Sequence, residues 1–137
     1  MLCSGRTGSC GCSKDRYKKI TGKNSVQFTG HEEIRGRRWS HIKSHARTRG
    51  LEFSVTIKYA WKLYEKQNRK CALSGLPIEF DKNGGNTSAS LDRINSSLGY
   101  IEGNVQWTHK LVNKMKWDFS QQEFLNFCRL VAERKVA

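Results

Sequence analysis

The sequence has no long apolar run. None of its hydrophobic stretches approaches the ~18 residues that cross a bilayer, and the first residues lack the apolar core of a signal peptide. The 137 residues also contain no internal repeat. These absences argue against an integral membrane protein and against a repeat architecture. We expect a cytoplasmic protein folded as one domain with a modest core.

Acidic residues are scarce. Asp and Glu number 12 against 25 Lys and Arg, which gives a formal charge of +13 at pH 7. Solubility needs only a few net charges, whereas release of counterions from phosphates is a common use of a strong basic excess. We find no basic amphipathic segment that would anchor the protein to a membrane surface. The charge balance therefore predicts a nucleic acid as the partner.

Five cysteines form an odd set, which is unlike a disulfide framework. In a reducing compartment they are expected to be thiols or metal ligands. Three of them, Cys3, Cys10 and Cys12, fall in residues 1–30, which we interpret as a basic tail in front of a domain over residues 31–137.

Two helices are expected first. The spacing of Trp39, Ile42 and Ala46 predicts a helix over about 37–49. Thr56 is expected to cap a second helix, from which Trp61 and Tyr64 pack inward. Residues 71–80 are interpreted as a turn leading to a strand.

Two strands and two more helices follow. We expect strands over 89–94 and 105–107 around a tight loop, then a helix over about 108–117 with an apolar stripe of Val112, Met115 and Phe119. Ser120 and Glu123 predict a capping box that opens a last helix. The buried face of that helix is expected to hold Phe124, Phe127, Cys128 and Val131. The fold class expected is α+β.

Residues 90–116 carry the chemistry. Asp92, late on the first strand, offers a carboxylate, and Asn113, on the helix, offers a neutral amide oxygen. Two such ligands suit Mg²⁺ (or Mn²⁺), which keeps several waters and leaves positions for a phosphate. Asn104, at the start of the second strand, is placed to hold the loop between the strands.

This stretch resembles the HNH endonucleases, which belong to the His-Me finger (ββα-metal) nucleases. Their pattern is a strand ending in Asp-His, a loop, an Asn heading the second strand, and a His or Asn on the helix. Asp92, Asn104 and Asn113 match three of these positions, and Lys116 matches a basic residue one turn later. The segments CALSGLPI, SLDRI, GYIEGNVQW and NKMK resemble HNH-like proteins common in phages. The resemblance implies a ββα core over about 71–119 and a metal-dependent endonuclease that acts on double-stranded DNA. It also implies that the protein is phage or prophage encoded and acts in homing or DNA processing.

One departure from the family concerns the general base. Arg93 stands where the family has its histidine, and a guanidinium cannot accept a proton from water at neutral pH. Arg93 is instead expected to hold the scissile phosphate. The base remains open between His109, four residues before Asn113, Tyr100 in the loop, and a metal-bound hydroxide.

A second departure concerns zinc. Many HNH proteins brace the motif with zinc on two Cys-x-x-Cys pairs, but Cys71 retains half of the first pair and His109 stands where the second would be. We expect no zinc there and a Cys71 that packs as a small hydrophobe. The cysteines Cys3, Cys10 and Cys12 resemble part of a zinc knuckle, either a zinc site or a truncated module.

Basic residues cluster near the expected metal site. The residues predicted to contact DNA are Arg37, Arg38, Lys43, Lys110, Lys114 and Lys116. The sequence therefore predicts a Mg²⁺-dependent DNA endonuclease. The main alternative is a catalytically weak HNH relic that binds DNA without cutting it. An adaptor built on the Cys-rich tail is a third reading.

Overall fold

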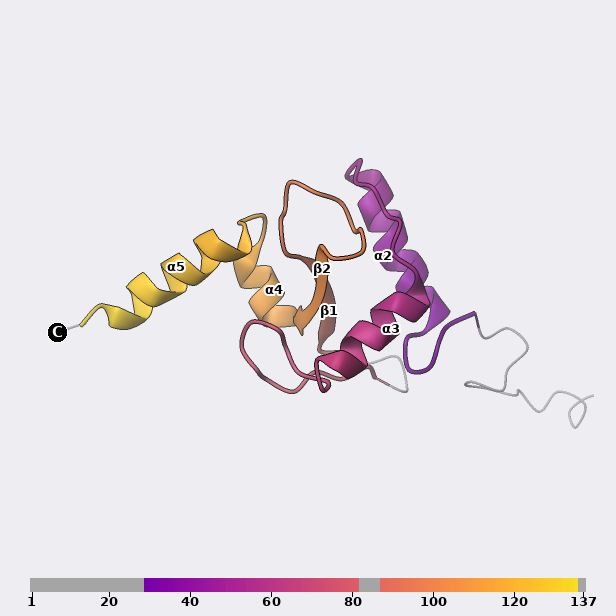
Figure 1. Ribbon diagram of the computed structural model, residues 1–137, viewed down its shortest axis with the longest axis horizontal. Helices are drawn as coiled ribbons and strands as arrows, with labels where there is room; N and C mark the ends of the chain where they lie inside the picture. Colours follow the sequence, from indigo (N-terminus) through magenta and orange to yellow (C-terminus); the bar gives the residue numbers. More distant parts are fainter. Residues whose placement is uncertain (1–28, 82–86, 136–137) are drawn as a thin grey trace, which may run out of the picture.

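The computed structural model describes residues 29–81 and 87–135. In chain order it contains α2 (Gly36–Thr48), α3 (Ile57–Lys66), β1 (Ala89–Arg93), β2 (Val105–His109), α4 (Lys110–Lys116) and α5 (Gln121–Glu133). The expected α+β class is confirmed, with two leading helices, a ββα unit and one C-terminal helix (Figure 1). The part of the chain that the structure describes has no helix long and apolar enough to cross a membrane.

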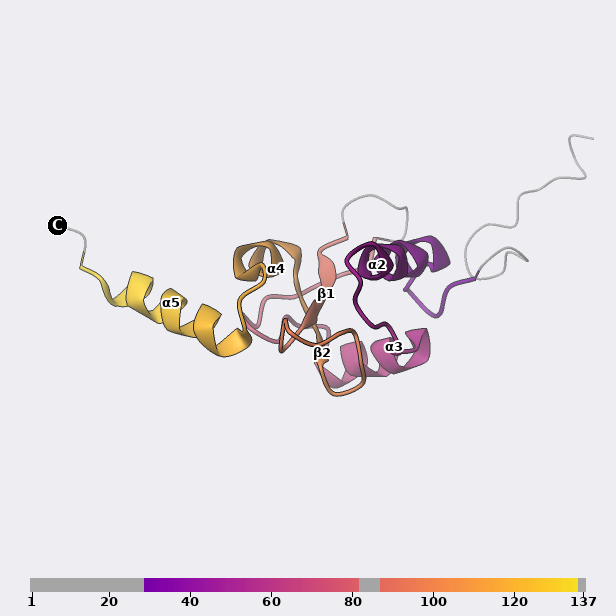
Figure 2. The same cartoon turned by 90° about the horizontal axis from the view of Figure 1, so that it is seen from above.

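The ββα unit lies at the centre of the molecule. β1 and β2 pair antiparallel, so that Leu91 lies opposite Trp107 and Asp92 lies opposite Gln106. α4 follows β2 directly, because His109 ends the strand and also caps the helix. β2 is two residues longer and α4 starts two residues later than the sequence predicts. Figure 2 shows α2 and α4 on either side of β1.

Helices α2 and α3 pack inward as expected. Trp39 and Ala46 are buried on α2, and Trp61 and Tyr64 are buried on α3. The Thr56 side chain accepts a hydrogen bond from the Tyr59 backbone N–H, which is the predicted N-cap.

The main core forms around Trp107. It is fully buried at the centre of β2, and its indole N–H donates to the Ala60 carbonyl at 2.7 Å. Phe80 packs edge-on against it, with ring centroids 4.9 Å apart. Apolar burial around one large aromatic thus joins α3, the segment before β1 and the hairpin into one body.

The last two helices differ from expectation. The capping box of Ser120 and Glu123 is present. Of the expected apolar face of α5, however, Phe124 is buried while Phe127 is 54% and Val131 is 76% exposed. Figures 1 and 2 show why, because α5 runs away from the body and no other described element lies along it.

The apolar stripe predicted for the motif helix is likewise mostly outside the core. Val112 packs partly against it, but Met115 is 66% and Phe119 is 47% exposed. Periodicity identified these helices correctly, but it cannot indicate that the partner surface is missing.

Candidate active site

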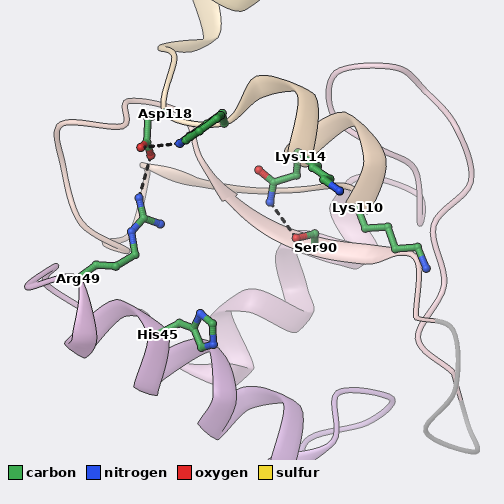
Figure 3. Close-up of a pocket in the computed structure, with 8 residues that line it drawn as sticks. His45, Arg49, Ser90, Lys110, Lys114 and Asp118 are labelled. Carbon is green, nitrogen blue, oxygen red and sulfur yellow. Dashed lines mark hydrogen bonds and ion pairs between the residues drawn. The ribbon is translucent and has the colours of Figure 1, made fainter.

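A cleft of about 740 Å³ lies between α2, β1 and α4 (Figure 3). It is lined by His45, Arg49, Ser90, Lys110, Asn113, Lys114, Trp117 and Asp118. The residues thus come from three elements far apart in the sequence. The ββα unit supplies the floor and one wall, and α2 supplies the opposite wall.

The lining is mostly cationic. Arg49, Lys110 and Lys114 are exposed, and Asp118 is the single carboxylate among the lining residues. Asp118 is paired with Arg49, whose Nη2 lies 2.8 Å from Oδ1. The one carboxylate of the lining is therefore already paired with Arg49, and the two lysines leave the surface with a positive charge that attracts an anion such as a phosphate.

His45 is an imidazole in this cleft. It projects from α2 toward the hairpin, as Figure 3 shows, one turn before Arg49. On its other side lies the ring of His41, whose centroid is 4.3 Å away. Imidazole is the side chain that most often moves protons in enzymes, so His45 adds acid–base chemistry to a cationic cleft.

Asn113 is fixed at the floor of the cleft. Its Nδ2 donates to the Ser90 Oγ at 2.8 Å, which ties α4 to β1. Because the amide nitrogen makes this bond, the amide oxygen is left as an acceptor or ligand. The predicted role of Asn113 as a metal ligand uses that atom.

Asp92 lies on the same side of β1 as Ser90, but deeper. It is 5% exposed, and its two carboxylate oxygens accept from Lys116 Nζ at 3.1 Å and from Gln106 Nε2 at 2.9 Å. Gln106 also donates to the Gln121 side chain at 3.0 Å, which links the hairpin to the start of α5. Asp92 is thus an ion-paired carboxylate in which each oxygen accepts one hydrogen bond.

The donors Asp92 and Asn113 fit a hard divalent cation in chemical type. Both offer oxygen, and each Asp92 oxygen keeps a second lone pair beside the hydrogen bond that it accepts. The buried Lys116 ammonium would share the Asp92 carboxylate with the ion. Among the described residues no group of three or more His, Cys, Asp or Glu could hold a metal, so water and phosphate would supply the remaining ligands.

Asn104 braces the loop between the strands. Its Oδ1 accepts from the Asn95 N–H at 2.9 Å, and its Nδ2 donates to the carbonyls of Asn95 and Gly99. The loop also packs against the segment before α3, where a Cβ added to Gly99 would clash with the Glu52 carbonyl oxygen. Asn104 is therefore a positioning residue of the hairpin loop in this structure.

Arg93 faces that loop. It is 5% exposed, and its Nη1 donates to the carbonyls of Ser96 and Leu98. The guanidinium lies over the Tyr100 ring, 5.6 Å from its centroid, and reaches Asp118 at 3.6 Å. Arg93 thus contacts the cleft lining through Asp118. Its contact with the scissile phosphate stays a prediction.

The two protein bases considered from the sequence lie outside the cleft lining. His109 caps α4, and its Nδ1 accepts from the Leu111 N–H at 3.3 Å. Tyr100 packs between Arg93 and Phe53, with its backbone bonded to Glu52. Each side chain has a local structural role, and neither contacts Asn113 or Ser90 through a bond that the structure describes.

The residues predicted to contact DNA differ in their position and exposure. Lys110 and Lys114 line the cleft, and Arg37 and Lys43 are exposed on α2. Arg38 is half-buried, and its Nη2 donates to the Ala89 carbonyl at 3.4 Å.

Lys116 corrects an expectation. We expected it on the exposed face of the motif helix, but it is fully buried and donates to both Asp92 and the Arg93 carbonyl. Its ammonium replaces solvent as the partner of a buried carboxylate, so in this structure it does not present a charge to DNA.

Cys71 is buried as expected, 3% exposed within the core. Burial raises the pKa of its thiol, but hydrogen bonds from the Ser74 side chain and from backbone groups of His109, Ser74 and Leu73 outweigh it, and the pKa ends below its usual value. The predicted zinc residues Cys3, Cys10 and Cys12 lie outside the described residues.

Sequence reasoning missed four residues as parts of the site, namely His45, Ser90, Trp117 and Asp118. The helix carries His41, His45 and Arg49 at intervals of four, which places them on one face. That spacing was a usable signal, but nothing local in the sequence indicates that this face lies opposite α4.

Comparison with known proteins agrees with this fold. No family model matches the chain. The solved structure of the rare-cutting HNH restriction endonuclease PacI is similar, with a TM-score of 0.55 over 85% of this chain and 92% of that chain, at 15% sequence identity. At such identity the likeness shows a shared fold, which is that of an HNH endonuclease.

Two viral proteins are similar in sequence. One is an uncharacterized 29.0 kDa protein of Enterobacteria phage T4, encoded in the dda-modA intergenic region, which is 31% identical over 98 residues. The other is the uncharacterized protein R423 of Acanthamoeba polyphaga mimivirus, 29% identical over 115 residues. The matches cover 72% and 84% of this chain but 38% and 20% of those proteins, so the chain spans a minor part of their length.

Proposed function

We propose that this protein is a DNA endonuclease that hydrolyses phosphodiester bonds in the cleft between α2 and α4 and that requires Mg²⁺ or Mn²⁺. The cleft carries the proposal, because it joins exposed cations, an imidazole and an oxygen ligand on a ββα unit. Similarity to an HNH restriction endonuclease and to viral proteins supports the same activity and a phage or prophage origin.

Each residue has a proposed role. Lys110 and Lys114 hold the DNA backbone at the scissile phosphate, where the charge of the transition state develops. His45 accepts the proton of the attacking water, and it is a better candidate than His109 because it lines the cleft. Asp92 and Asn113 would hold the divalent ion, which when bound supplies Lewis-acid stabilisation of the phosphate.

The alternative of a non-cutting DNA-binding relic is favoured by two contacts. Arg93 is occupied by loop carbonyls, and Asp92 is already neutralised by Lys116. Both contacts are compatible with a cleft that binds phosphate but no longer hydrolyses it.

A plasmid assay separates the two functions. Supercoiled DNA is incubated with the full chain in Mg²⁺ or Mn²⁺, with EDTA as the metal-free control, and the nicked and linear forms are quantified. We expect metal-dependent relaxation, and a strong loss of rate in Asn113→Ala, whose side chain is at the floor of the cleft. Wild-type protein that shifts DNA in a gel yet relaxes none would establish the relic.

A further inference from the structure

Trp117 is exposed in a way that the other tryptophans are not. The chain has four tryptophans. Trp39, Trp61 and Trp107 are at most 9% exposed, whereas Trp117 is 76% exposed. Burial in the core therefore does not explain its presence, and it lies in the lining of the cationic cleft.

The backbone conformation at position 117 does not explain why a tryptophan stands there either. It is the C-cap of α4, with φ of 50° and ψ of −122°. Helix ends with positive φ usually carry glycine, and such a conformation is strained for a bulky side chain. Residues with a strained backbone conformation of this kind are found preferentially at functional sites, where they contact ligands.

The indole is held in place. Its Nε1 donates to Asp118 Oδ2 at 2.9 Å, and the other oxygen of Asp118 accepts from Arg49 at 2.8 Å. Arg93 approaches the same carboxylate from the loop side. The ring is thus positioned before any ligand arrives, which lowers the entropic cost of a contact with one.

We propose that Trp117 stacks on a nucleobase of the nucleic acid held in the cleft. An aromatic ring beside lysines is the combination that binds nucleic acid strands, because the cations follow the phosphates while the ring faces a base. A protein partner fits less well, since the lining that includes Trp117 also includes the cations Arg49, Lys110 and Lys114. This inference rests on the proposed function and adds the base contact to it.

The tryptophan itself is the probe. The full chain in EDTA, so that no DNA is cut, is titrated with single-stranded and duplex oligonucleotides that carry a fluorescent label. Label anisotropy reports binding. Quenching of tryptophan emission by acrylamide reports Trp117, because the other three tryptophans are buried and therefore shielded from acrylamide. We expect DNA to quench the emission and to protect it from acrylamide.

Variants test the contact directly. Trp117→Gly removes the ring and relieves the backbone, so it should fold at least as well as wild type while its Kd for DNA rises roughly 5- to 100-fold. Trp117→Phe keeps a stacking ring and should bind more tightly than the glycine variant. Leu130→Ala, which truncates a 63% exposed residue on α5, is the matched control and should leave Kd unchanged.

The outcomes are distinct. DNA binding with Trp117 still open to acrylamide, or a glycine variant that binds as wild type does, overturns the stacking contact and leaves the proposed function standing. Wild-type protein that binds no DNA overturns the proposed function itself. Quenching by a protein partner with none by DNA also overturns the inference.

Discussion

The ammonium of Lys116 lies 3.1 Å from a carboxylate oxygen of Asp92, and the two side chains are 0% and 5% exposed. The pair joins the C-terminal turn of α4 to the end of β1, where the hairpin loop starts. Lys116 also donates to the Arg93 carbonyl at 2.7 Å, so its charge is met by two acceptors in the interior. A residue that by sequence resembles a DNA contact is therefore part of the frame that holds the site.

Removing Lys116 alone should be costly. In Lys116→Met the Asp92 carboxylate stays buried without its counter-charge, and we expect the free energy of unfolding to fall by about 3–5 kcal/mol. Denaturant unfolding measures this, with Lys114→Met, exposed on the same helix, as the control that should change little.

The double variant separates loss of a pair from loss of packing. Replacing Asp92 by Leu together with Lys116→Met removes both charges, and most of the lost stability should return, since apolar replacements of buried pairs are often neutral. If the double variant lost as much stability as the single variants Asp92→Leu and Lys116→Met together, the ion pair would not be the cause of the loss.

His45 should be needed for hydrolysis more than for DNA binding. General bases contribute typically 10²- to 10⁴-fold to a rate, so His45→Gln should lose about that much nicking while its gel shift stays close to wild type. His41→Gln is the matched control, exposed one turn away on α2 and outside the cleft lining. If His109→Gln lowered the rate strongly and His45→Gln did not, the general base would be His109 at the end of β2.

The capping box predicts a pH dependence at α5. Hydrogen bonds from the Ser120 hydroxyl and backbone N–H lower the pKa of Glu123 below its usual value. A lowered pKa in the folded state stabilises the ionised form, so this contribution is complete above the pKa of an unfolded glutamate, about 4.3, and is lost as the pH falls through the folded pKa.

Amide hydrogen exchange in the first turn of α5 measures that loss. Exchange should accelerate as the pH falls below about 4.3 relative to the intrinsic rate of each amide. Glu123→Gln should remove the pH dependence, whereas Glu133→Gln, exposed at the other end of the helix, should retain it. Identical pH profiles for all three proteins would contradict the role of the box.

Several parts of this structure could be predicted from local sequence signals. The helix caps at Thr56 and Ser120 follow from side chains that bond the nearest backbone N–H groups, and the hairpin follows from two short strands around a glycine-containing loop. The order of strand, strand and helix also follows from the sequence pattern. The assignment of Asp92 and Asn113 to one metal site was strengthened by the match to a known motif and stays a prediction.

The missed features depend on contacts between distant segments. Lys116 is buried because β1 provides Asp92 as its partner, and His45 belongs to the site because α2 lies opposite α4. The exposure of Phe127 reflects the absence of a described element beside α5, which no periodicity can reveal. Sequence pattern gives the face of a helix, but tertiary structure decides what that face meets.

Binding to DNA should show which lysines meet phosphates. Each phosphate contact contributes about 0.9 to the slope of log K against log salt, because one counterion is released. Lys110→Ala and Lys114→Ala should therefore weaken binding at low salt and each reduce the slope by about that amount. Lys62→Ala, exposed on α3 outside the cleft lining, carries the same loss of net charge and should leave the slope unchanged. The control loses the same net charge as the other two variants. Equal changes in all three would therefore mean that DNA is attracted by the overall positive charge of the protein and is not held in the cleft.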